Sequence, residues 1–166
     1  MTPTSWTLAE LAHAEGLAPL VMEKVKQVNE HHSQAVQYAL GGNLPILMGT
    51  DPVWPGMHGR NYMELVHLIR DGLTPLRAWH GATGLAAREL GRPDVGTIGT
   101  GQRADLLIAS ADVLAKPELF ERGALVEVLQ DGVGHRGLAG VPQRSYAGAA
   151  REALRRVFAA PAQAEA

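Results

Sequence analysis

The chain has 166 residues, of which 46% are hydrophobic and 19% are charged. This composition is typical of a globular protein with a real core, and it excludes an intrinsically disordered chain. A net charge of -2 gives no basic surface for nucleic acid, and the absence of cysteine excludes both a disulfide framework and a cysteine-based zinc site.

The first residues carry no recognisable export signal. Between Met1 and Trp6 there is no basic region followed by an apolar run, so we expect no signal peptide. No apolar stretch approaches the roughly 18 residues of a membrane span. We therefore expect a cytoplasmic chain with neither a membrane nor a nucleic-acid partner.

The first part of the chain predicts helices around one buried strand. A short helix or turn is expected over residues 7–15, and apolar residues at spacings of three and four predict a helix over residues 19–40. Residues 44–48 are apolar on both faces and are bounded by helix breakers, which favours a buried parallel strand. The following loop is expected to be irregular because it contains Pro52, Pro55, Gly56 and Gly59.

Two more helices are expected after this loop. Asn61 is the predicted N-cap of the first, with Glu64 three residues later in a capping-box position. Thr74 and Pro75 are predicted to start the second, which runs to Leu90. This order of elements is typical of an α/β protein, in which the loops after the strands hold the functional site.

After Pro93 the pattern changes from helical to β. Residues 104–110 and 124–130 are predicted strands, and Asp131-Gly132 is a turn signal after the second of them. An amphipathic helix is expected over residues 146–159.

An ordered series of short motifs runs through the middle of the chain. Its members are Gly49-Thr50-Asp51, His58-Gly59, Glu64-Leu65, Gly72-Leu73-Thr74-Pro75, Ala82-Thr83, Ala86-Ala87, Leu90-Gly91, Val95-Gly96-Thr97-Ile98, Gly101 and Ala104-Asp105-Leu106. The series resembles the C-terminal portion of the amidohydrolase superfamily, in its imidazolonepropionase-like and Xaa-Pro dipeptidase-like (prolidase-like) branch. The resemblance is close over residues 35–114 and looser over residues 1–34.

The resemblance implies a (β/α)8 barrel with a small β-sandwich domain. By this match, residues 1–92 are the last βα units of the barrel, residues 93–138 are strands of the small β domain, and residues 139–166 are a C-terminal helix and tail. One strand cannot close a barrel. We therefore expect an α/β chain that is the C-terminal segment of an incomplete barrel.

The resemblance also implies a catalytic position. Asp51 matches the aspartate at the mouth of the eighth barrel strand, which in relatives binds one of one or two divalent metals, usually zinc, and takes a proton from the metal-bound water. His58, in the following loop, is expected to contact the substrate. The expected reaction is hydrolysis of a C–N bond, such as an amide or dipeptide bond, in a small-molecule or peptide-like substrate.

Most of the family's other metal ligands have no counterpart in the sequence. Relatives carry a His-x-His pair on the first barrel strand, and these 166 residues contain none. We therefore expect a truncated fragment that is inactive alone and needs the missing N-terminal half of the barrel, or a complementing chain. The alternative is a non-catalytic interaction or scaffold module derived from such an enzyme. A homo-oligomer is left open, and an α/β-hydrolase is disfavoured because no Gly-x-Ser-x-Gly motif occurs.

The remaining polar candidates are expected to be structural. His31 and His32 are adjacent on a predicted helix, so they face different directions and are expected to be solvated. Asp105 is expected to hold the turn formed by residues 101–104.

Overall fold

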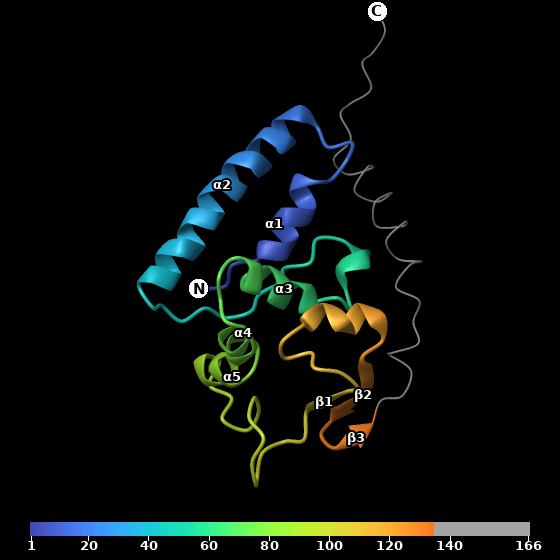
Figure 1. Ribbon diagram of the computed structural model, residues 1–166. Coiled ribbons are helices and arrows are strands. Elements are labelled where there is room, and N and C mark those ends of the chain that lie inside the picture. The colour runs from blue at the N-terminus through green and yellow to red at the C-terminus, as the bar shows by residue number, and fades with distance from the viewer. Residues whose placement is uncertain (135–166) are drawn as a thin grey trace, which may run out of the picture.

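A computed structural model describes residues 1–134, as a set of packed helices followed by a small sheet (Figure 1). The helical part contains α1 (Ser5–Ala12), α2 (Pro19–Gly41), the 3-10 helix η1 (Pro55–Met57), α3 (Tyr62–Arg70), α4 (Pro75–Ala82) and α5 (Gly84–Glu89). The later part contains β1 (Leu106–Ala109), the 3-10 helix η2 (Pro117–Arg122), β2 (Leu125–Gln130) and β3 (Val133–Gly134). The helix predicted over residues 146–159 lies outside the described residues. Among residues 1–134, no helix is both long and apolar enough to cross a membrane.

Helix α3 occupies the centre of the helical part (Figure 1). It contacts α1, α4 and η2, while α2 packs along α1. Because Leu65 and Leu68 are three residues apart, they project from one face of α3 into the core. The buried residues of this core come from α2, α3, α4 and the segments between them: Ala39, Ile46, Leu65, Leu68, Leu73 and Ala78.

The prediction of a β-strand over residues 44–48 is wrong. The segment has no regular secondary structure, although Ile46 is buried as expected. The Leu47 N–H donates to the carbonyl of Met1 at 2.8 Å, and the Met48 N–H donates to the carbonyl of Gly81 at 3.1 Å. A strand requires a hydrogen-bonded ladder with a neighbouring strand. Within residues 1–134 no strand lies beside this segment, so it enters the core as an irregular apolar run.

Gly81 is the residue at which α4 touches this apolar segment. A Cβ at Gly81 would lie 2.4 Å from the backbone oxygen of Ile46. We expect Gly81→Ala to force α4 away from the segment and to lower the free energy of unfolding by about 1–3 kcal/mol. Urea denaturation would measure the loss. The control is Gly41→Ala, at a helical position with nothing within 4 Å, and equal effects of the two changes would contradict the prediction.

The single helix predicted from Pro75 to Leu90 is divided into α4 and α5. Thr83 separates them, with φ -129° and ψ -103°, which is outside the helical region. The start of the helix is as predicted, because the side chain of Thr74 accepts a hydrogen bond from the Arg77 N–H at 3.3 Å.

The two strands predicted after Pro93 are present as β1 and β2. Together with the short β3 they form an antiparallel sheet in the order β1-β2-β3. Leu106 of β1 lies opposite Leu129 of β2. Asp131 and Gly132 have positive φ values of 53° and 77° and make the predicted tight turn between β2 and β3.

Asp105 has a structural role, but not at the turn that we predicted from the sequence. Its carboxylate accepts a hydrogen bond from the Asp131 N–H at 2.7 Å. Asp105, which directly precedes β1, therefore holds the turn between β2 and β3 instead of the turn at residues 101–104.

Candidate active site

Asp51 ends the apolar segment and presents its side chain to solvent, while Thr50 before it is buried. Its φ is 46°, in a region that few residues other than glycine adopt. Pro52 follows it, and a residue before proline normally keeps a negative φ and an extended conformation. The surroundings must therefore stabilise the backbone at Asp51.

Thr7 of α1 provides this support. Its side chain is buried, and its hydroxyl lies 2.5 Å from the carbonyl oxygen of Thr50 and 3.1 Å from that of Asp51. The hydroxyl proton is shared between these two acceptors, which belong to the peptide groups before and after Asp51. A helix 44 residues earlier in the sequence thus fixes both peptide groups of the candidate catalytic position.

His58 lies in the loop after Asp51, at the end of η1, and it is exposed. Its N–H donates to the carbonyl of Pro55 at 3.2 Å. Met57 beside it is 1% exposed and anchors the loop against the protein, so it does not line an open pocket. The substrate contact expected for His58 stays a prediction.

The metal site expected around Asp51 is not complete within the described part of the chain. A zinc ion in a protein is held by about four ligands. Residues 1–134 contain no group of three or more His, Cys, Asp or Glu side chains arranged to hold a metal ion. These residues therefore do not fit a whole metal centre, and the assignment of Asp51 as a metal ligand stays a prediction.

Glu64 of α3 is fully buried, and its role differs from the capping box predicted for it. Asn61 makes no side-chain cap. The two carboxylate oxygens of Glu64 accept hydrogen bonds from the backbone N–H groups of Ser5 and Trp6, each at 2.8 Å. These N–H groups open α1, whose N-cap residue Thr4 gives no side-chain cap. Glu64 therefore caps α1 from another helix.

The environment of Glu64 shifts its protonation equilibrium. Burial raises the pKa of its carboxyl to about 7, although the hydrogen bonds from Trp6 and Ser5 act in the opposite direction. The spacing of residues in α3 indicates that Glu64 is buried. Glu64 and Leu68 are four residues apart, so the carboxylate falls on the apolar face of α3.

A second, partly buried polar cluster joins α1, α2 and the end of α3. The Ser5 hydroxyl donates to Asp71 Oδ2 at 2.7 Å and lies 3.0 Å from His32 Nε2. Burial lowers the pKa of His32, and the negative charge of Asp71 partly opposes this shift. In a Ser-His-Asp triad the histidine receives the serine proton, whereas here the aspartate binds the serine directly. The cluster is a structural clamp, and His32, which we expected to be solvated, is partly buried in it.

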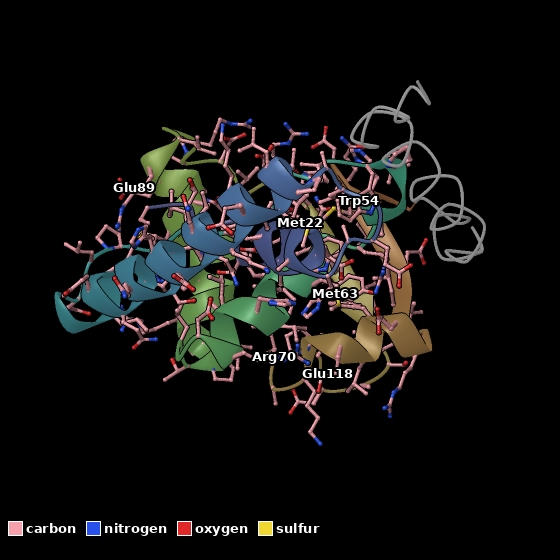
Figure 2. All side chains as sticks on the ribbon, turned by 90° about the horizontal axis from the view of Figure 1, so that it is seen from above. Met22, Trp54, Met63, Arg70, Glu89 and Glu118 are labelled. Atoms are coloured by element: carbon pink, nitrogen blue, oxygen red, sulfur yellow. The ribbon has the colours of Figure 1, made fainter. Side chains whose placement is uncertain are left out.

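A shallow pocket lies between α3 and η2, apart from Asp51 and His58. Figure 2 shows two charged residues of its lining, Arg70 and Glu118, next to each other. The other lining residues are Val66, Ile69 and Ala115.

The family assignment comes from comparison with known proteins. The sequence pattern of the amidohydrolase family matches residues 1–134. The chain belongs to the amidohydrolase family. This confirms the resemblance inferred from the ordered motifs around Asp51, including its prolidase-like character, because similar solved structures include a Xaa-Pro dipeptidase.

Several solved amidohydrolase-like structures share this α/β arrangement. A Xaa-Pro dipeptidase with bound methionine has a TM-score of 0.68 and 25% identity, over 81% of this chain and 33% of that one. An ochratoxinase from A. niger has a TM-score of 0.65 and 26% identity, over 85% of this chain and 34% of that one. Among curated proteins, adenine deaminase 2 of Agrobacterium fabrum (strain C58 / ATCC 33970) is 40% identical over 72 residues, which is 40% of this chain and 12% of that protein. The chain thus spans about a third of the length of these solved relatives.

Proposed function

We propose that this chain contributes one part of the active site of a metal-dependent hydrolase that cleaves a C–N bond. The observation that carries the proposal is the exposed carboxylate of Asp51, on a backbone that a distant helix fixes at a positive φ. A carboxylate can serve both as a metal ligand and as a proton acceptor. The similarity to a Xaa-Pro dipeptidase supports an amide or dipeptide bond as the target.

In this proposal the described residues belong to a larger architecture. Residues 1–92 correspond to the last βα units of a (β/α)8 barrel, in which residues 44–48 would gain the neighbouring strand that residues 1–134 do not supply. Residues 93–134 form part of a small β-sandwich domain. A divalent metal, zinc in our proposal, takes Asp51 as one ligand and its other ligands from segments outside the described residues. The chain alone is then inactive until an N-terminal barrel segment or a complementing chain supplies those ligands, and His58 contacts the substrate.

The first test is zinc binding by the purified chain. We expect calorimetric titration with Zn²⁺ to give weak binding at most, because a single carboxylate holds zinc poorly. Asp51→Asn should change the titration little. Tight binding of one zinc per chain that is lost in Asp51→Asn would contradict the proposal that other segments complete the site.

The second test supplies the other ligands. Residues 1–134 would replace the corresponding third of the Xaa-Pro dipeptidase with which they share 25% identity. In this chimera we expect Asp51→Asn to lower kcat for dipeptide hydrolysis by about 10²- to 10⁴-fold. The matched control is Asp112→Asn, which keeps the oxygen that accepts the Ala115 N–H. Full activity in the Asp51→Asn chimera, or a folded chimera without activity, would count against the proposal.

A further inference from the structure

The contacts around α1 form a continuous path from Glu64 to Asp51. The carboxylate of Glu64 holds the first N–H groups of α1, at Ser5 and Trp6. Less than one turn later, Thr7 donates to the carbonyl oxygens that flank Asp51. Every side chain of this path before Asp51 is buried, whereas Asp51 itself reaches solvent.

The backbone geometry indicates why such a path is needed. Asp51 combines a positive φ with a following proline, a combination that a free chain avoids. A residue in such a conformation keeps it only when its surroundings determine it. In the described structure, the hydroxyl of Thr7 is the side-chain group that binds the peptide units on both sides of Asp51.

We propose that Thr7 and Glu64 are positioning residues of the active site. Thr7 sets the direction of the Asp51 carboxylate through its two backbone hydrogen bonds, and Glu64 sets the position of Thr7 by capping α1. This inference rests on the proposed function for its link to catalysis. Its structural part, that the backbone at Asp51 depends on Thr7 and through it on Glu64, is measurable without any activity.

The test follows the amide resonances of Thr50 and Asp51 in ¹⁵N-labelled full-length chain. Thr7→Val keeps the shape of the side chain but removes the hydroxyl, so we expect both resonances to shift or broaden. Thr7→Ser restores a hydroxyl, and we expect both resonances to return to their wild-type positions. Thr97→Val, at an exposed threonine in another loop, is the control and should leave them unchanged.

A double substitution tests the path itself. Glu64→Gln should shift the Asp51 resonance, and this shift should disappear when Thr7→Val is already present. The proposal is overturned if Thr7→Val leaves the Asp51 resonance in place, or if Glu64→Gln shifts it equally with and without Thr7. If Thr7→Val does not fold, the other two variants still test the proposal. Thr7→Ser must leave the Asp51 resonance in place, and Glu64→Gln must shift it.

The chimera connects the result to catalysis. There we expect Thr7→Val to lower kcat at least tenfold while KM changes little, and Thr7→Ser to recover most of the loss. If Asp51→Asn abolishes activity and Thr7→Val does not change it, the positioning role is refuted while the proposed function stands. If Thr7→Val moves the Asp51 resonance but Asp51→Asn keeps full activity, the proposed function fails and the backbone coupling stands.

Discussion

The free energy of unfolding of the wild-type chain is expected to fall, relative to that of Glu64→Gln, as the pH rises from 5 to 8. Burial raises the pKa of Glu64 from 4.5 to about 7 in the folded chain. Folding therefore favours the protonated carboxyl. The stabilisation that the folded chain gains from the protonated Glu64 is fully present below pH 4.5, and it is lost as the pH rises through 7. The pKa shift corresponds to a change of about 3 kcal/mol in the free energy of unfolding. About 2–3 kcal/mol of this change falls between pH 5 and pH 8.

The comparison with Glu64→Gln separates this effect from other titrations. Burial also lowers the pKa of His32 and of His67. Those groups act with the opposite sign, because their contribution is lost as the pH falls below 6.5. They are common to both proteins and cancel in the difference. Urea unfolding at pH 5, 6, 7 and 8 would give the slope. A flat or rising difference would mean that the hydrogen bonds from Ser5 and Trp6 keep Glu64 ionised in the folded chain.

Leu68→Ala is expected to destabilise the chain by about 2–5 kcal/mol. Leu68 is 0% exposed and lies in the core that joins α2, α3 and α4. Truncation removes buried methyl groups and leaves a cavity, because the helices around it can close only partly. With a total stability on the order of 5–15 kcal/mol for a domain, this loss is a large fraction of the whole.

The matched control for Leu68→Ala is Leu76→Ala. Leu76 lies in helix α4 but is 81% exposed, so its truncation should change the free energy of unfolding by no more than about 0.5 kcal/mol. Both variants would be compared by urea denaturation at one pH. Similar losses in the two would show that Leu68 is not in a packed core.

The sequence predicted the elements whose signals are local. Spacings of three and four predict α2, and Asp131-Gly132 predicts the turn that follows β2. The run at residues 44–48 has the composition of a strand, yet composition cannot supply a hydrogen-bonding partner. In the described chain its N–H groups bind Met1 and Gly81 instead.

In the candidate site, too, the sequence predicts what local motifs specify and misses contacts between distant residues. The catalytic assignment of Asp51 comes from the family resemblance carried by the ordered series of motifs, and it stays a prediction. The part played by Thr7 could not be predicted, because 44 residues separate it from Asp51. For Glu64 the sequence predicts the wrong hydrogen-bonding partner. A glutamate three residues after Asn61 has the spacing of a local capping box, and spacing alone cannot reveal that its carboxylate reaches another helix 59 residues away in the sequence.

The cap that Glu64 provides to α1 also sets an order of events during folding. Helix α1 has 8 residues, whereas an isolated helix needs about 12–15 to be even marginally stable in water. The ribosome produces α1 before α3. We therefore expect α1 to become stably helical only after the segment that contains Glu64 has been synthesised and has formed α3. Only then can Thr7 be placed, and only after that can the peptide groups around Asp51 adopt their final conformation. The segment around Asp51 is therefore expected to be among the last described regions to become ordered, and early folding intermediates should lack its final conformation.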